Sequence, residues 1–165
     1  MSTPTSPFHH SSFAGIIGVG VEDITPPVGI FARNWGAAAL DVASGVHRPL
    51  WCKVLTLQDL SNNSPFVLAS LDLGWWKTRE DEWLVRGGLI EELGLDETRV
   101  LVNLAHTHAG PGLCREDSNL PGGEFIAPYL HTVREALMRA TKNALASAKS
   151  GVLEWSSGWC DHHRR

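Results

Sequence analysis

The feature that most constrains the fold of this chain is a single apolar stripe along residues 127–148. Its members recur every three or four residues, which is the repeat of one face of an α-helix: Leu130, Val133, Leu137, Ala140, Ala144 and Ala148. A long helix with one apolar side buries that side against another layer of secondary structure. The sequence therefore predicts a helix over 127–148 that packs on a second, apolar layer.

Further apolar stretches predict the strands of that layer: 14–24, 50–58, 65–73, 99–105 and 152–159. The first ends at Pro26 and Pro27, which cannot donate backbone hydrogen bonds to a sheet. A polar turn at 59–64 predicts that the second and third strands pair as a hairpin. A second helix is expected over 79–93, before Gly94. This order of elements predicts an α/β fold: a layered, mixed and partly antiparallel sheet with flanking helices.

Two segments are expected to be loops. Residues 29–46 contain several small residues and little periodicity, and residues 109–123 are rich in glycine and proline. Long ordered loops often carry function. Residues 29–46 are therefore a candidate site-forming segment.

Composition and charge exclude several functional classes. The chain has 165 residues, enough for one domain, and a net charge of −4 with scattered basic residues, which argues against nucleic-acid binding. No apolar stretch reaches the length of a membrane-spanning helix, and residues 1–12, which are expected to be flexible, do not resemble a secretory signal. Three cysteines without CxxC spacing are typical of a reducing compartment. A soluble, cytoplasmic protein is therefore expected.

The strongest chemical signal comes from His106 and His108, which follow the strand expected over 99–105. Side chains two residues apart on a strand project to the same face, so both imidazoles would point into one cavity. Imidazole is a common metal ligand, so both rings can bind one zinc ion, or one ring can bind the ion and the other the substrate. The alternative is two polar residues at a strand end. Spacing alone does not decide between these interpretations.

Four other residues are candidates for the lining of the same site. Asp72 ends a strand, where a carboxylate can orient a histidine, bind a metal or cap a turn. His47 precedes a strand and could enter the cavity, although an isolated histidine is more often a surface residue. Gly110 and Gly112 carry no Cβ, so the backbone there can approach a neighbour closely and its amides can face an anion.

Four segments, in this order, resemble the N-terminal catalytic domain of the neutral/alkaline, non-lysosomal ceramidase family. The first is an opening glycine segment with Asp-Ile-Thr-Pro-Pro (18–27), and the second is a Gly-Val-His segment before a strand (45–50). The third is a strand that ends in an acid (67–72), and the fourth is a His-Thr-His-Ala-Gly-Pro signature (103–112). The combination is more specific than any one segment. The resemblance extends over about residues 14–155.

The resemblance implies an activity, a cofactor and two residue roles. Members of the family hydrolyse the N-acyl (amide) bond of ceramide, with zinc (Zn2+) activating a water molecule. By resemblance, His106 would be a zinc ligand, and His108 would lie beside the ion and bind or polarise the substrate amide. The implied substrate is a lipid or small-molecule N-acyl amide.

The resemblance also implies an incomplete site. The family completes its zinc site with a further histidine, a glutamate and a tyrosine, downstream of the matching segments. Residues 13–160 are therefore expected to be the N-terminal portion of a ceramidase-like domain, and residues 161–165 a divergent tail.

Three interpretations of this incomplete site follow. The first is a zinc-dependent amidase, present here as the N-terminal portion of its domain. The second is a non-catalytic, truncated remnant or a partner-dependent fragment of such an enzyme. The third is another His-x-His metallohydrolase, although no Asp-His pair follows His108 as the metallo-β-lactamase pattern requires.

Overall fold

A five-stranded sheet forms one layer of the computed structural model, which describes residues 10–156, with the side chains of 12–61 and 64–156. The strands are β1 (His10–Asp23), β2 (Trp51–Asp59), β3 (Asn62–Leu71), β4 (Val100–Leu104) and β5 (Lys149–Ser156). Their order across the sheet is β4-β3-β2-β1-β5. β4 runs parallel to β3, whereas the other neighbouring pairs are antiparallel. The predicted mixed, partly antiparallel sheet and the β2-β3 hairpin are confirmed.

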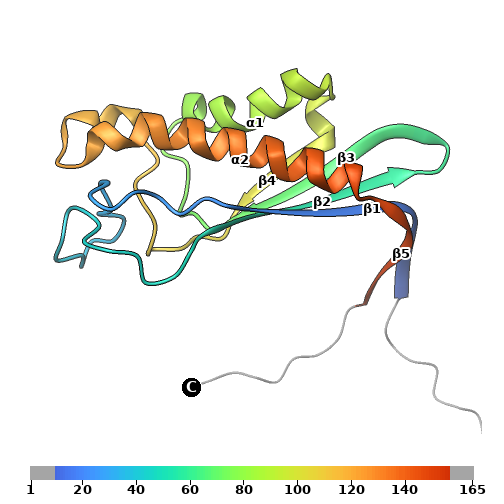
Figure 1. Ribbon diagram of the computed structural model, residues 1–165, viewed down its shortest axis with the longest axis horizontal. Helices are drawn as coiled ribbons and strands as arrows, with labels where there is room; N and C mark the ends of the chain where they lie inside the picture. Colours follow the sequence, from blue (N-terminus) through green and yellow to red (C-terminus); the bar gives the residue numbers. More distant parts are fainter. Residues whose placement is uncertain (1–9, 157–165) are drawn as a thin grey trace, which may run out of the picture.

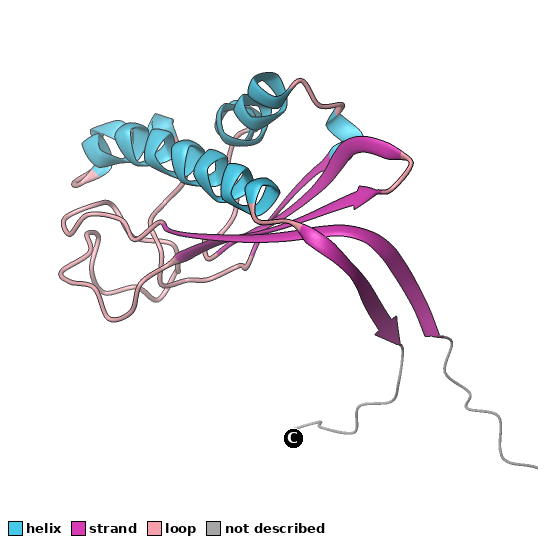
Figure 2. Cartoon of the chain, turned by 45° about the vertical axis from the view of Figure 1, so that its right-hand side comes forward, coloured by secondary structure: helices cyan, strands magenta, loops and turns pink. Residues whose placement is uncertain are grey.

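Both long helices lie on the same face of the sheet (Figures 1 and 2). Helix α1 spans Arg79–Leu93 and helix α2 spans Ile126–Ala146. The Thr78 hydroxyl accepts a hydrogen bond from the backbone N–H of Asp81 at the start of α1, and Gly94 ends the helix with a left-handed φ of 60°. Three short 3-10 helices complete the chain: η1 (Glu97–Arg99), η2 (Arg115–Asn119) and η3 (Gly123–Phe125). A helix layer on a mixed sheet is the α/β class that was predicted.

The apolar stripe of α2 lies in the core, as predicted. Its first five members are fully buried, and Ala148 lies beyond the end of the helix. The helix crosses β1 at Gly18 and Gly20, where a Cβ atom would lie 2.0 Å from the backbone oxygens of Ala144 and Ala140, respectively. The two glycines therefore let the helix contact the strand backbone directly.

Element boundaries differ from the predicted ones at several places. β1 begins at His10, so residues 10–12, which were expected in a flexible terminus, pair with β5. β3 ends at Leu71, two residues early, and β4 ends at Leu104. The loop expected over 109–123 contains η2 and the start of η3. The expected tail at 161–165 lies outside the described residues.

The described part of the chain contains buried thiols and no membrane-spanning helix. Cys52 and Cys114 are both buried and free. Burial, with the nearby carboxylates of Glu22 and Asp72, raises the pKa of Cys52 to about 12, so this thiol stays protonated and unreactive. No helix among residues 10–156 is both long and apolar enough to cross a membrane.

No described helix covers the sheet face opposite α1 and α2 (Figure 2). One cross-strand row on this face runs over four strands and contains Val19, Leu55, Leu68 and Leu101. Val19 is 63% exposed and Leu101 is 53% exposed. Antiparallel strands with one solvated face usually alternate apolar and polar residues. This row instead has the composition of a buried surface.

Candidate functional site

The two candidate histidines lie where the parallel strands end. Because β3 and β4 run in the same direction, the loops that follow them leave the sheet at the same edge. Backbone hydrogen bonds hold these loops side by side: Ala105 N–H donates to Leu71 O at 2.9 Å, and Thr107 N–H donates to Leu73 O at 3.2 Å. The loop that carries the histidines is therefore supported by the chain that follows β3.

His106 has an unusual backbone conformation. Its φ of 58° is in the left-handed region, and no other non-glycine residue of the described chain has a positive φ. Because β4 has already ended at Leu104, the prediction that strand geometry aligns the two rings is wrong. The rings of His106 and His108 still meet, with centroids 5.2 Å apart and planes at 71°. Such backbone conformations concentrate at functional sites, because they persist only where the surroundings hold them.

Two tryptophans lie against the histidine pair. Trp75, in the loop after β3, has its ring centroid 5.3 Å from that of His106 and 5.4 Å from that of His108. Trp35, in the loop 29–46, contacts His108 edge-on at 4.5 Å. Neither tryptophan was predicted to belong to the site. Two signals could have found them: Trp75 belongs to a pair of adjacent tryptophans, and Trp35 lies in the loop that was expected to be functional.

The buried residue Asn34 joins the two loops of the site. Its backbone oxygen lies 3.1 Å from Nδ1 of His108, a residue 74 positions away. Its side-chain amide donates hydrogen bonds to the backbone oxygens of Gly110, at 3.0 Å, and Pro111. The loop 29–46 is therefore attached both to His108 and to the chain just after it. Sequence reasoning missed Asn34, whose only signal was its place in that loop.

Gly110 and Gly112 are both buried in this contact between loops. The N–H of Gly112 donates to Phe31 O at 3.0 Å, and a Cβ atom at Gly112 would lie 3.1 Å from the Phe31 ring. The Gly112 amide is therefore already bonded and is not free to face an anion. Its position instead brings two backbones close together.

Asp72 contacts the start of β2, and His47 lines a pocket beside the histidine loop. Asp72 accepts a hydrogen bond from Trp51 N–H at 3.1 Å and lies 3.7 Å from Nζ of Lys53. These contacts join the end of β3 to the start of β2, so Asp72 has the capping role that was its alternative interpretation. His47 is exposed and lies at the edge of a separate pocket.

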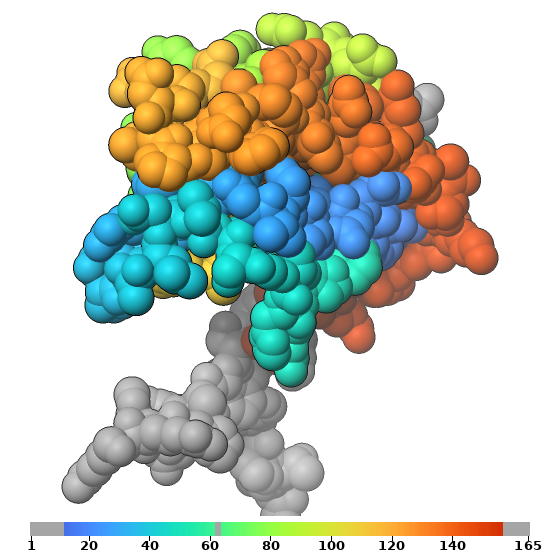
Figure 3. Space-filling model, turned by 60° about the vertical axis from the view of Figure 1, so that its left-hand side comes forward, coloured from blue at the N-terminus to red at the C-terminus, as the bar shows by residue number. Residues whose placement is uncertain are grey.

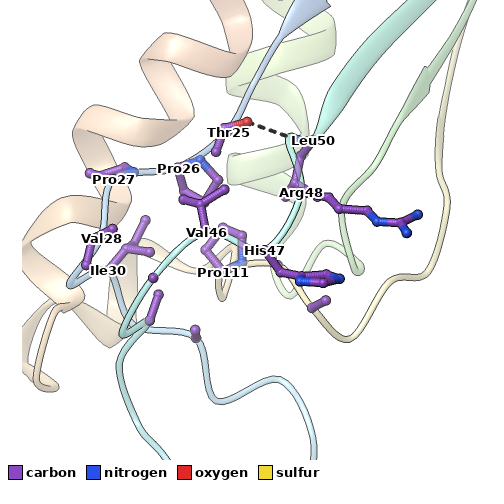
Figure 4. Close-up of a pocket in the computed structure, with 15 residues that line it drawn as sticks. Thr25, Pro26, Pro27, Val28, Ile30, Val46, His47, Arg48, Leu50 and Pro111 are labelled. Carbon is purple, nitrogen blue, oxygen red and sulfur yellow. Dashed lines mark hydrogen bonds between the residues drawn. The ribbon is translucent and has the colours of Figure 1, made fainter.

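That pocket is apolar, has a volume of about 220 Å³ and adjoins the histidine loop. Figure 4 shows its main lining residues: Pro26, Pro27, Val28, Ile30, Val46, Leu50 and Pro111. Leu50 N–H donates to the Thr25 hydroxyl at 3.0 Å and joins two of its walls (Figure 4). The side chains of His47 and Arg48 point away from the apolar lining. Ala109 and Gly110 belong to both the pocket wall and the histidine loop.

Sequence patterning did not reveal this pocket, because its walls come from segments distant in the chain. The segment 25–50 forms this side of the molecule, beneath the start of α2 (Figure 3, blue to cyan). The glycine loop supplies the opposite wall. Only the folded chain brings these two segments together.

The imidazoles of the site are side chains that bind zinc, but they are too few to form a complete zinc site. Among the residues that the structure describes, no group of three His, Cys, Asp or Glu side chains is placed to hold a metal ion. A catalytic zinc ion normally has three protein ligands and one open position. The two imidazoles therefore fit only part of a catalytic zinc centre.

Comparison with known proteins identifies the architecture. No protein-family model and no curated protein matches the sequence. The neutral ceramidase from Pseudomonas aeruginosa matches in structure with a TM-score of 0.68 at 20% sequence identity, over 82% of this chain and 22% of that chain. A ceramidase complexed with C2 matches with a TM-score of 0.69 at 21% identity, over the same shares of 82% and 22%. The fold is that of part of a ceramidase.

This ceramidase-like fold confirms, for the architecture, the resemblance carried by the four sequence segments. The chain spans 22% of the length of the solved chains it matches. At such low sequence identity the likeness concerns the fold alone. The chemistry must therefore be argued from the site itself.

Proposed function

We propose that this chain forms one wall of a zinc-dependent hydrolase site that cleaves an N-acyl (amide) bond. The observation that carries the proposal is the pairing of His106 and His108, with rings 5.2 Å apart, at the carboxyl end of the parallel strands. Ligands of α/β proteins commonly bind at this edge of the sheet. In the proposal His106 is one zinc ligand, and His108 binds or polarises the substrate amide. A bound zinc ion would activate water and stabilise negative charge on the amide oxygen.

The proposed substrate is a lipid or small-molecule N-acyl amide. The apolar pocket of about 220 Å³ beside the histidine loop supports this choice, because it offers space for an apolar chain close to polar groups. The acyl chain would lie among residues such as Val46 and Pro111. The substrate amide group would then face His108, just beyond the shared wall at Ala109 and Gly110.

The proposal requires zinc ligands from beyond the described residues, because those residues contribute only two imidazoles. Further residues of a ceramidase-like domain or a partner chain would supply them. This chain would then provide the histidine pair, the tryptophans beside it and the pocket.

Zinc content and amidase activity test the proposal, measured on this chain and on a full-length ceramidase-like relative. The relative should contain zinc and hydrolyse an N-acyl amide, and should lose both when the histidine aligned with His106 becomes alanine. This chain should bind zinc weakly, and His106→Ala should abolish that binding. His131→Ala, which changes an exposed histidine on α2, is the matched control and should have no effect. Absence of zinc from both proteins would refute the proposal.

A non-catalytic remnant is the second candidate function. Two observations favour it: the lack of a third metal donor among the described residues, and the uncovered apolar face of the sheet. Turnover of an N-acyl amide by this chain alone, abolished by His106→Ala, would exclude the remnant.

A further inference from the structure

We propose that Asn34 is a positioning residue that holds His108 in one tautomer, with the proton on Nδ1 and the lone pair on Nε2. The use of Nε2 toward a substrate or ion rests on the proposed function, but the tautomer itself does not. Three features of the structure carry the inference: the contact to the ring, the anchoring of Asn34 and the packing of the ring from the side.

The first feature is the contact between the His108 ring and a backbone carbonyl. A carbonyl oxygen can only accept a hydrogen bond. The 3.1 Å contact between Nδ1 of His108 and the backbone oxygen of Asn34 therefore requires a proton on Nδ1. In the neutral ring, Nε2 then has no proton and keeps its lone pair. Free histidine in water favours the other tautomer, so the contact reverses the intrinsic preference.

The second feature is the anchoring of that carbonyl by the Asn34 side chain. The residue is 7% exposed, and both hydrogen bonds of its amide group go to backbone oxygens, those of Gly110 and Pro111. A Cβ atom at Gly74 would lie 3.7 Å from Nδ2 of Asn34, and one at Gly112 would lie 3.7 Å from Oδ1. The side chain is thus packed between two glycines, which leave room for it. Asparagine is suited to this position because its amide group supplies two N–H donors.

The loop that carries Asn34 is held at its base as well. Phe31 and Val42 form an isolated antiparallel bridge, and Ala32 N–H donates to Asp41 O at 2.8 Å. The loop that carries the Asn34 carbonyl is therefore held in place by backbone hydrogen bonds. The side chain of Asn34 then fixes the distance from this loop to His108.

The third feature is the packing of the His108 ring from the side. Trp35, the next residue after Asn34, contacts the ring edge-on at 4.5 Å. Trp75 lies 5.4 Å away on the other loop. The His108 ring is exposed, but its hydrogen bond at Nδ1 and its contacts with two aromatic rings together favour one orientation. The same segment thus sets both the tautomer and the orientation of His108.

The test is the tautomer of His108, measured by long-range 15N–1H correlation NMR on the whole, metal-free chain with labelled histidine. The pH should lie well above the usual imidazole pKa of about 6.5, so that the ring is neutral. We expect His108 to be predominantly the Nδ1–H form in the wild type. Asn34→Asp keeps the size of the side chain but removes its N–H donors, and should shift His108 predominantly to the Nε2–H form. Asn119→Asp, at an exposed position in η2, is the matched control and should leave the tautomer unchanged.

Two results would overturn the inference: a wild-type His108 in the Nε2–H form, or an Asn34→Asp variant that is folded and keeps the Nδ1–H form. The signals of His131 on α2 report whether each variant is folded. If Asn34→Asp does not fold, the variant Asn34→Ser replaces it in the test. Its side chain retains one hydrogen-bond donor, so we expect a ratio of tautomers between those of the wild type and the Nε2–H form. An unchanged ratio would count against the role of Asn34. Because the test uses no metal and no substrate, its result is independent of the zinc and amidase measurements.

Discussion

His106 has an imidazole side chain on a backbone in the left-handed conformation, with φ of 58°. For a residue with a Cβ atom this conformation costs roughly 1–2 kcal/mol, whereas glycine adopts it freely. Backbone conformations of this kind persist only where the surroundings hold them, and they concentrate at functional sites.

Replacement of His106 by glycine or by alanine separates the effect of the imidazole from the effect of the left-handed backbone. Both variants lose the imidazole and should bind zinc equally poorly. The glycine variant removes the strain of the left-handed φ, because glycine has no Cβ atom. Its free energy of unfolding should therefore exceed that of His106→Ala by about 1 kcal/mol. Urea unfolding of the two variants measures this difference. Equal stabilities would show that the backbone at His106 carries no strain.

At the scale of elements, one buried carboxylate joins helix α1 to the loop that follows the histidines. Asp81 in the first turn of α1 is 1% exposed and accepts hydrogen bonds from the Arg115 side chain, from Arg115 N–H at 3.2 Å and from the Thr78 hydroxyl at 2.7 Å. Burial acts to raise the pKa of Asp81, but the hydrogen bonds from Arg115 and Thr78 outweigh it and hold the pKa below its usual range. The carboxylate therefore anchors η2, and with it the end of the glycine loop.

Asp81→Asn should destabilise the chain in a pH-dependent manner. Because the pKa of Asp81 is lower in the folded than in the unfolded state, its contribution is present above the unfolded value of about 3.9 and is lost as the pH falls below it. At neutral pH the cost should be about 2 kcal/mol, since Arg115 is 43% exposed and is partly solvated when unpaired.

Urea unfolding of wild type and Asp81→Asn across this pH range measures the effect. Asp117→Asn, which removes a more exposed ion pair with Lys77, should cost no more than about 1 kcal/mol. A cost for Asp81→Asn that did not shrink below about pH 4 would show that the charge of Asp81 is not its source.

At the scale of the whole molecule, the helices that the structure describes cover only one side of the sheet (Figure 1). The uncovered side carries the apolar row of Val19, Leu55, Leu68 and Leu101. Solved ceramidases contain this fold as 22% of a longer chain. An apolar sheet face with no covering layer favours association or exposure to hydrophobic probes.

Leu101→Thr should therefore reduce the binding of a hydrophobic dye and lower self-association. Threonine is β-branched, a shape that suits a strand, so the sheet should remain intact. Leu60→Thr changes a leucine that is 72% exposed in the turn after β2, outside the apolar row, and should have little effect. Dye fluorescence and light scattering compare the two variants. Equal effects would show that the row on the sheet does not act as one surface.

The fold was predictable to the extent that it follows from local periodicity. The stripe of α2, the hairpin of β2 and β3, and the start of α1 at Arg79 all depend on residues within a few positions of each other. The histidine pair could be singled out for the same reason. Asn34, in contrast, meets Gly110 across 76 positions. No short-range pattern carries such a contact.

By itself the sequence determined the α/β class and the element order, and it singled out His106 and His108 as candidate site residues, because side-chain period and spacing are local properties of a chain. Tertiary structure alone decided what surrounds them. It turned the backbone at His106, brought Asn34 and the two tryptophans to the rings, and paired Asp81 with Arg115. These outcomes depend on how distant loops pack at the carboxyl edge of β3 and β4, and that packing is a property of the folded molecule.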